Sequence, residues 1–261
     1  PFAFTGIKFE FRALGSSLNI ACPNMMINVA VADAMESMLG TLEKAKPADF
    51  EKTARKLIKD TYLAHKAVVF NGNNYSSEWI DVESKKRGLP EIKSTPEALP
   101  YYTLPKNVEL LARYGVMNAR ECEARKEILL EQYAKVINIE AYTMYKMTAK
   151  MILPACVEFM NVLSESVANK KDLGMTYDYE GSILYKAGKL TDEAYARNNK
   201  LEELRRTAAG ITDVEKRTMY LHDVVLSEME DLRSVIDSLE LLISSDYWPL
   251  PSYGDMLFYA D

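Results

Sequence analysis

The sequence is poor in the two residues, cysteine and histidine, that most often build soft metal sites. Its 3 cysteines, Cys22, Cys122 and Cys156, are widely separated and form no Cys-x-x-Cys pair. Their odd number and wide spacing exclude a disulfide framework and favour a reducing, cytoplasmic compartment. Neither of its 2 histidines, His65 and His222, has a glutamate three residues before it. The Glu-x-x-His pairs of a di-iron helical bundle are therefore excluded.

The chain also lacks an excess of positive charge and a long apolar run. Its 32 basic and 38 acidic residues give a net charge of -6 and a pI of about 5.2, which argues against a nucleic-acid partner. No apolar run approaches the length of a bilayer span, and the N-terminal residues do not follow a signal-peptide pattern. We therefore expect neither nucleic acid nor a membrane among its partners. With 48% hydrophobic residues, the 261-residue chain can bury a sizeable core.

The most informative pattern that is present lies near the N-terminus, over residues 7–13. Apolar residues occupy the odd positions and charged residues the even ones, namely Lys8, Glu10 and Arg12. This period of two predicts a half-buried strand, with same-face residues about 6–7 Å apart. A carboxylate between two cations at that spacing could hold a divalent metal ion and the negative oxygens around it. The alternative interpretation is an outward face whose charges pair with one another along the strand.

A strand at the very start of the chain has a structural consequence. A lone strand leaves its backbone donors and acceptors unpaired, and even a hairpin is marginal in water. The chain also begins at Pro1 and not at a methionine. We therefore expect it to be the C-terminal part of a longer polypeptide that supplies the neighbouring strands.

The remainder of the chain is predicted to be mainly α-helical. Apolar residues at helical spacing predict helices over residues 23–46 and 47–69, and serine caps and Gly88 delimit one over residues 76–87. Segments 95–97 and 105–115 predict shorter helices.

Two longer periodic runs follow, over residues 118–169 and 191–245, and they predict a pair of long antiparallel helices. Pro154 should disrupt the first run near residues 150–152, because it removes a backbone donor. The second run is interrupted at Gly210, after which Thr212 and Glu215 match a capping box.

The segments that flank these long runs show no clear period. Residues 170–189 are predicted to form the hairpin tip or an exposed insertion. Residues 248–261 are predicted to form an extended tail that its aromatic side chains hold on a surface.

Four segments carry a resemblance to a known family. The strand Lys8-Phe9-Glu10-Phe11-Arg12, with the residues on either side of it, resembles the late catalytic strand of glutamine synthetase, and more narrowly of the type III enzymes. The closing segment, residues 247–258, is similar to the closing segment of the same type, as are residues 70–76 and 87–90. The resemblance spans nearly the whole chain and is weakest over residues 170–210.

This resemblance implies roles for the three charged residues of the strand. Glu10 matches a ligand of the metal, Mg2+ or Mn2+, that bridges the ATP phosphates. Arg12 matches the arginine that contacts glutamate and its phosphorylated form, and so counts as catalytic and substrate-binding. Lys8 matches a phosphate-facing position that is usually arginine, and the change keeps the charge but loses the planar fork.

The resemblance also implies an activity and an architecture. The family makes glutamine from glutamate, ammonia and ATP through γ-glutamyl phosphate, and type III enzymes are ring-built homo-oligomers, which implies a dodecamer here. Residues 1–45 would end the catalytic domain, with the first strand in its β-sheet, and residues 46–261 would form a C-terminal helical region. The other metal ligands would lie outside this chain, so we expect it to be inactive alone. The alternative is a non-catalytic helical assembly or regulatory module, in which Glu10 and Arg12 are surface charges.

Overall fold

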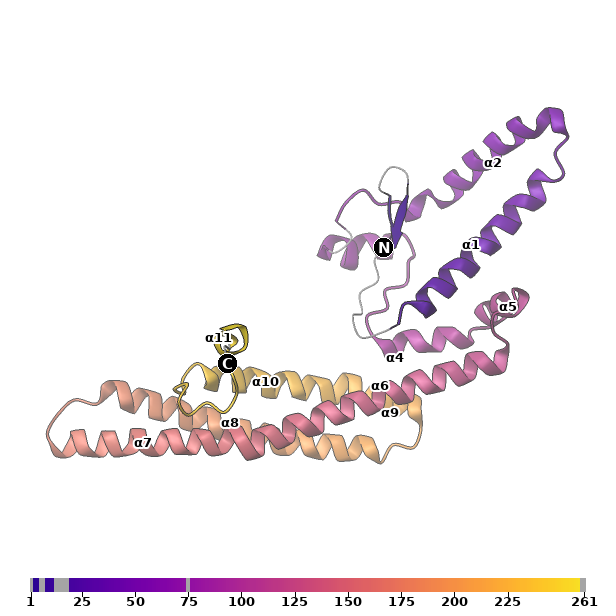
Figure 1. Cartoon of the computed structure of the whole chain (residues 1–261). Coiled ribbons are helices and arrows are strands. Elements are labelled where there is room, and N and C mark those ends of the chain that lie inside the picture. The colour runs from indigo at the N-terminus through magenta and orange to yellow at the C-terminus, as the bar shows by residue number, and fades with distance from the viewer. Residues whose placement is uncertain (1, 5–7, 12–18, 74–75, 259–261) are drawn as a thin grey trace. The chain divides into compact units, whose positions relative to one another are not determined.

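The computed structural model describes residues 2–4, 8–11, 19–73 and 76–258 (Figure 1). Most of these residues are helical, as the sequence predicts. The chain divides into two compact units. Unit 1 contains residues 1–93 and 100–123, and unit 2 contains residues 94–99 and 124–261. The predicted division between residues 45 and 46 concerns a catalytic domain that extends beyond this chain, and it stays a prediction.

Unit 1 opens with two short strands. Strand β1 (Phe2–Phe4) pairs antiparallel with β2 (Phe9–Phe11), and Ala3 lies opposite Glu10 in the register. Strand β2 falls inside the stretch whose alternation predicts a strand. The rest of that stretch, apart from Lys8, lies outside the described residues.

Two helices form a hairpin after the strands. Helix α1 (Ala21–Leu42) packs against α2 (Phe50–His65), and short 3-10 turns, η1 (Pro47–Asp49) and η2 (Lys66–Val68), flank α2. Pro47 begins the turn η1 that leads into α2, as predicted. Proline is tolerated in a first helical turn, because the backbone N–H that it lacks would have no partner in the helix. The two predicted helices are confirmed.

The rest of unit 1 is built from shorter helices. A π-helical turn, η3 (Glu78–Glu83), runs into α3 (Ser84–Lys86), which ends at Gly88 with a φ of 67°. Helix α5 (Pro105–Arg113) follows the 3-10 turn η4 (Leu99–Thr103). A small core joins α1 and α5 through Val29, Leu111, Met117 and Cys122.

Unit 2 is an antiparallel bundle of three long helical segments (Figure 1). The first is one continuous helix over Ala119–Asp172, composed of α6 (Ala119–Met147), the π-turn η5 (Thr148–Ile152) and α7 (Leu153–Asp172). The second is α8 (Asp178–Ala209). The third is composed of α9 (Val214–Tyr220), the π-turn η6 (Leu221–Val225) and α10 (Leu226–Glu240). Short α4 (Thr95–Ala98) packs against α9.

Helix α8 is the central member of the bundle, since it packs against both α7 and α10. The core residues that are most deeply buried come from all three segments and include Leu201, Leu221, Leu232 and Leu239. The predicted disruption near residues 150–152 is confirmed, because the π-turn η5 ends immediately before Leu153 and Pro154. Proline removes the donor that an α-helical turn would need there.

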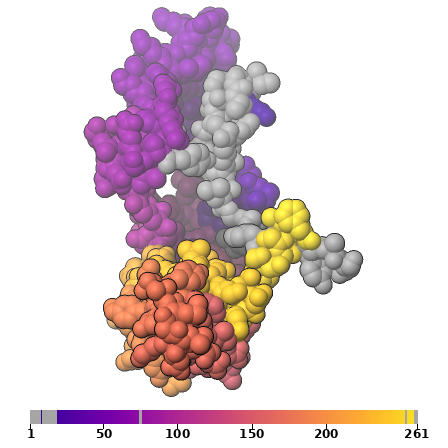
Figure 2. All heavy atoms as spheres, turned by 90° about the vertical axis from the view of Figure 1, so that its left-hand side faces the viewer, coloured from indigo at the N-terminus to yellow at the C-terminus, as the bar shows by residue number. Residues whose placement is uncertain are grey.

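Two predictions about unit 2 need correction. The tip of the α7–α8 hairpin lies within residues 170–189, as one of the two alternatives predicts, but it spans only residues 173–177, with Gly174 at a φ of 67°, and the rest of that segment is helical. The polar composition of early α8 hides its helical period. The N-cap of α9 is Asp213, whose carboxylate accepts from the Lys216 amide at 2.8 Å, and not Thr212. Figure 2 looks onto the end of the bundle where α7 passes into α8.

The C-terminal tail follows the prediction in part. Tyr247 lies against Phe159, with ring centroids 5.7 Å apart, and Trp248 and Leu250 also pack on the core of unit 2. The prediction of an extended tail is wrong for Tyr253–Phe258, which form helix α11. Ser252 acts as the N-cap of α11, because its hydroxyl accepts a hydrogen bond from the backbone N–H of Asp255, the third residue of that helix.

The first bundle segment also corrects an expectation about membranes. Within the described residues, part of the helix Ala119–Asp172 is long and apolar enough to cross a membrane, judged by length and composition alone. The expectation that no apolar run approaches this length is therefore wrong. Of the apolar 18-residue stretch within this helix, 17% is buried inside the structure. The helix nevertheless packs along α8 and places Ala141, Ile152 and Cys156 in the core. Core helices of water-soluble proteins pass the same test, so this is weak evidence for a membrane span.

Candidate functional site

The three predicted site residues lie at the start of unit 1. Glu10 is the central residue of β2, and Lys8 immediately precedes this strand and is exposed. The Glu10 side chain and the whole of Arg12 lie outside the described residues. The predicted row of cation, carboxylate and cation therefore stays a prediction.

The donor set for a metal ion is incomplete among the residues that the structure describes. Among the residues whose positions are described, no group of three His, Cys, Asp or Glu side chains could hold a metal ion. Mg2+ takes about six oxygen ligands, and Glu10 would supply one carboxylate. The described residues therefore do not provide a complete metal site, and the prediction that other ligands come from outside this chain stays a prediction.

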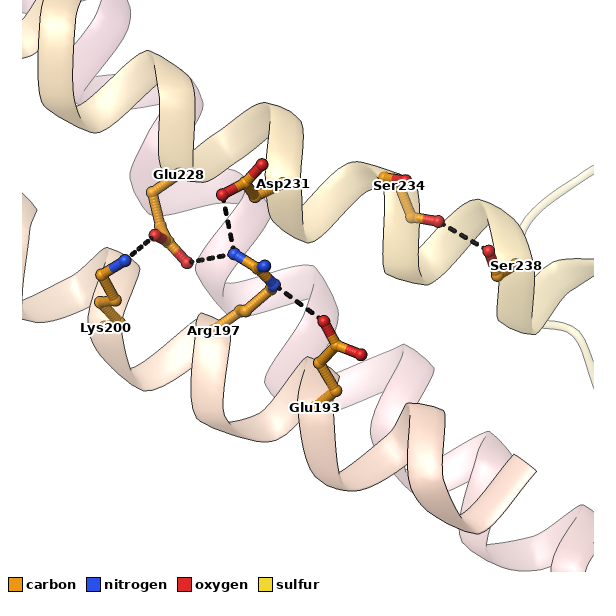
Figure 3. A network of polar contacts seen from close by, with 7 residues as sticks. All are labelled: Glu193, Arg197, Lys200, Glu228, Asp231, Ser234 and Ser238. Atoms are coloured by element: carbon orange, nitrogen blue, oxygen red, sulfur yellow. Dashed lines mark hydrogen bonds and ion pairs between the residues drawn. The ribbon is translucent and has the colours of Figure 1, made fainter. Parts of the chain in front are cut away.

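The most extensive described charge network joins α8 to α10 (Figure 3). Its centre is the Glu228 carboxylate, whose side chain is 3% exposed and contacts both Lys200 and Arg197. The Arg197 guanidinium also lies 2.8 Å from Asp231 and 3.2 Å from Glu193. Hydrogen bonding to Glu193 and Asp231 raises the pKa of Arg197 above its ordinary value.

This network explains how a carboxylate can be buried between two helices. An unpaired buried charge is costly, whereas a charge with two cationic partners is compensated. The acidic run Glu228-Met229-Glu230-Asp231 is typical of a solvated helix face, yet Glu228 is buried. Both cationic partners of Glu228 lie about 30 positions before it in the sequence, on α8, so no local pattern could have identified them.

A second cluster ties α8 to α6. The Arg205 guanidinium donates twice to the buried Glu202 carboxylate, at 2.7 and 3.0 Å, and once to the Asn138 side chain at 3.1 Å. It also lies over the Tyr142 ring, 4.9 Å from the centroid. Hydrogen bonds from Arg205, and then from Arg206, lower the pKa of Glu202 to about 2. Glu202 is thus held as a carboxylate at neutral pH, and the cluster is a structural ion pair.

Arg87 organises two of the segments that carry the family resemblance. Its guanidinium lies over the Phe70 ring at 5.4 Å and the Trp79 ring at 5.8 Å. The same side chain donates to the Ala67 carbonyl at 2.6 Å and to the Glu83 carboxylate at 3.1 Å. Phe70 and Arg87, which belong to these two segments, are therefore parts of one local structure. The only part of this structure that the sequence could have indicated is the Glu83–Arg87 pair, because its members are four residues apart.

An acidic group on α1 pairs with the end of α5. Arg113 lies 2.9 Å from Asp33, and the Tyr114 hydroxyl donates to Glu36 and, at 3.4 Å, to Asp33. Hydrogen bonding to Glu36 raises the pKa of Tyr114 to about 12. These contacts join two helices and use the acidic side chains of α1.

None of these clusters combines a nucleophile, a general base and a cavity. They stabilise helix packing, so the described part of the chain presents structural chemistry. Of the residues with a predicted role at the site, Glu10 lies in β2 and Lys8 immediately precedes this strand.

Comparison with known proteins adds evidence of descent. Residues 53–171 match the family model described as the glutamine synthetase C-terminal domain. The glutamine synthetase of Butyrivibrio fibrisolvens is 35% identical over 263 residues, which is 99% of this chain and 37% of that protein. The type-3 glutamine synthetase of Dictyostelium discoideum is 34% identical over 266 residues, 99% of this chain and 36% of that protein. The glutamine synthetase of Bacteroides fragilis is 29% identical over a similar span. The chain thus spans little more than a third of the length of these relatives.

Proposed function

We propose that this chain carries the C-terminal domain of the glutamine synthetase family and is the C-terminal portion of a type III enzyme of that family. The whole protein would be a glutamate–ammonia ligase. It would make glutamine from glutamate, ammonia and ATP by way of γ-glutamyl phosphate. The observation that carries this proposal is the similarity to named glutamine synthetases along 99% of the chain.

Within that protein, the segment at β2 would contribute to the active site. Glu10 would supply one ligand to a divalent cation, Mg2+ or Mn2+, Arg12 would bind glutamate and its phosphorylated form, and Lys8 would face phosphate. Phosphoryl transfer depends on positioned positive charge, which the side chains of Lys8 and Arg12 would provide together with the metal ion. Strand β2 would belong to the catalytic β-sheet, and segments outside this chain would supply its other strands and the remaining metal ligands.

Two further properties follow from the family and the composition. We propose a homo-oligomer of ring type, a dodecamer, in the cytoplasm. The three cysteines are free thiols, which is compatible with a reducing compartment.

The test is glutamine formation by the full-length protein that contains this chain. Replacing Glu10→Gln removes the charge but keeps the shape, and we expect at least a 100-fold loss of activity, roughly the effect of removing one electrostatic catalytic group. The matched control is Glu51→Gln, a carboxylate of α2 that pairs with Arg55 and is 79% exposed. This control should keep full activity. Unchanged activity of the Glu10→Gln protein would refute the catalytic assignment.

The second candidate is a helical assembly or regulatory module without catalysis. The helical bundle of unit 2, with its ion pairs between helices, is the observation that supports this second candidate. Size measurement of the Glu10→Gln protein separates the two. An intact oligomer without activity supports the catalytic role, whereas a dissociated protein with normal activity per folded subunit supports the assembly role.

A further inference from the structure

Helix α7 is packed against the rest of unit 2 along one side. The Cys156 side chain is fully buried and lies beside Thr191 of α8. Phe159 packs on the core of unit 2, and its ring centroid lies 5.7 Å from that of Tyr247 in the tail. These contacts define the inner side of α7.

The opposite side of α7, together with the turn η5 that leads into it, is exposed. Lys150, Pro154 and Glu158 follow one another at intervals of four residues, which places them on one side of the helix. Two apolar side chains flank them, Met151 with 40% exposure and Val157 with 48%. We call this side the α7 stripe, and it consists of these five residues together with the exposed Lys146 and Glu165.

The α7 stripe belongs to a long helix that is apolar and poorly buried. Of the apolar 18-residue stretch within Ala119–Asp172, 17% is buried inside the structure. Unit 2 therefore leaves much of this apolar surface in contact with solvent. Exposed apolar surface of this extent marks a site of interaction with another molecule.

The charges on the α7 stripe are separated by sign. Lys146 and Lys150 lie before Pro154, and Glu158 and Glu165 lie after it. Among the residues that the structure describes, Lys150, Glu158 and Glu165 take part in no ion pair. The stripe thus presents two cations at one end and two carboxylates at the other, with proline and apolar side chains between them.

We propose that the α7 stripe packs against the same stripe of a second copy of this chain, with the two helices antiparallel and a two-fold axis near Pro154. A surface whose charges are separated by sign becomes self-complementary under such an axis. Lys150 and Glu158 lie four residues on either side of Pro154, so the lysine of each copy meets the glutamate of the other. Lys146 meets Glu165 in the same way, with an offset of three residues, about 4.5 Å along the helix.

The arrangement of charges favours a second copy over other occupants. A parallel pairing in the same register would place Lys150 against Lys150 and Glu158 against Glu158, and juxtaposed like charges are unfavourable. A lipid surface is disfavoured as well, because Glu158 and Glu165 would have to enter the hydrocarbon region with the apolar side chains. The proposal rests on the proposed function in one respect, since it names one contact of the homo-oligomer proposed there.

A single thiol at the axis tests the geometry. A residue on a two-fold axis meets its own copy, so the full-length protein with Pro154→Cys should form a disulfide between two copies under mild oxidation. The matched control is Tyr195→Cys, which places a thiol at a position of α8 that is 61% exposed and lies outside the stripe. Protein without either substitution controls for the native thiols, and peptide mass spectrometry identifies the linked residues.

We expect at least about 10-fold more covalent dimer from Pro154→Cys than from Tyr195→Cys, because the interface holds the two thiols at a high effective concentration. If Pro154→Cys prevents folding, the double variant Lys150→Cys with Glu158→Cys replaces it. These two positions are about 12 Å apart along one helix, too far for a bond within one chain, so a disulfide between them joins two copies.

Charge reversal tests the register of the contact. Added to the Pro154→Cys protein, Lys150→Glu places carboxylates together at both ends of the contact, so the yield of disulfide should fall at least about 10-fold. Adding Glu158→Lys as well restores opposite charges and should return the yield to within about three-fold of its first value. Lys186→Glu, an exposed lysine of α8, is the control and should leave the yield unchanged.

Two results would overturn the inference. The first is a disulfide yield from the folded Pro154→Cys protein no higher than that of the control. Fast alkylation of this thiol would then show a free surface, and slow alkylation would show that a different segment or molecule covers it. The second is a disulfide yield that Lys150→Glu leaves unchanged, which would exclude the proposed pairing of charges.

Glutamine formation, measured on the same samples, separates this inference from the proposed function. A protein that forms the disulfide at Pro154→Cys but makes no glutamine before oxidation would keep the inference and refute the proposed activity. A protein that makes glutamine but forms no such disulfide would keep the proposed activity and refute the inference.

Discussion

The buried Glu228 carboxylate makes a quantitative prediction about bundle stability. Glu228 has a side-chain exposure of 3% and two cationic partners on α8, Arg197 and Lys200 (Figure 3). Replacing either cation by methionine leaves the other in place, so each single change should lower the free energy of unfolding by about 1–2 kcal/mol. Replacing both leaves a buried charge without compensation, which costs about 3–5 kcal/mol. The double change should therefore be at least as costly as the two single changes together.

Urea unfolding followed by circular dichroism measures these differences. The slope of free energy against urea concentration should stay constant, since the same surface is exposed on unfolding. The matched control is Arg233→Met, whose carboxylate partner Asp237 lies on the same helix, with side-chain exposures of 70% and 50%. An exposed pair of this kind contributes less than about 1 kcal/mol.

A third substitution decides whether charge burial is the cause. Adding Glu228→Leu to the double variant removes the uncompensated charge, so it should restore most of the lost stability. Two results would refute this reasoning: a double variant as stable as the Arg233→Met control, or a triple variant no more stable than the double one.

Three other changes test separate features. Hydrogen bonds from Arg205 hold the folded-state pKa of Glu202 near 2, below its unfolded value, so this carboxylate stabilises the fold above pH 4.5 and the contribution is lost as the pH falls toward 2. The free energy of unfolding, obtained from urea titrations across this pH range, should fall by an amount on the order of 2 kcal/mol more for the native chain than for Glu202→Gln, and identical pH profiles would contradict the assignment. Leu232→Ala, at a fully buried core position, should cost about 2–5 kcal/mol in the same unfolding assay, and a cost below 1 kcal/mol would contradict its core position. Gly174→Ala, at a φ of 67° after α7, should cost about 1 kcal/mol, and an unchanged midpoint would show that another backbone conformation is tolerated there.

Local rules predicted the elements whose signals are contained in a short window. The mainly helical fold, the long antiparallel helices and the disruption before Pro154 follow from periodicity and from the chemistry of proline. The predicted pair of long helices is wrong in number, because the chain reverses after Gly210 and α10 packs back on α8, which gives three segments. Helix 47–69 was predictable for the same reason, because a first-turn proline precedes an amphipathic stripe. In each case the deciding interactions are between residues a few positions apart.

Tertiary contacts decided the features that local patterns missed. Early α8 has a polar composition without a clear period, yet it is helical because it packs against α7 and because Glu180 pairs with Lys170. Glu228 looks like a surface residue in its own helix, and its burial depends on cations far away in the sequence. The N-cap at Asp213 was missed by one residue, because Thr212 and Asp213 are both good caps.

The candidate site illustrates a different limit. A strand with alternating charges is compatible with a catalytic edge and with a solvated face, and its residues alone do not distinguish them. The family resemblance made the distinction at Glu10, and the comparisons support the family. The role of Glu10 therefore stays a prediction from the resemblance, because the pattern of its own strand fits both interpretations.

Metal stoichiometry at Glu10 is the most direct test of the central claim. The full-length protein and its Glu10→Gln variant are titrated with Mn2+ in the presence of a non-hydrolysable ATP analogue, and bound metal is counted per chain. We expect the Glu10→Gln protein to bind one fewer Mn2+ ion, or to bind that ion at least about 10-fold more weakly, because the site loses a carboxylate ligand. Equal numbers and equal affinities of bound Mn2+ in the two proteins would contradict the assignment of Glu10 as a metal ligand.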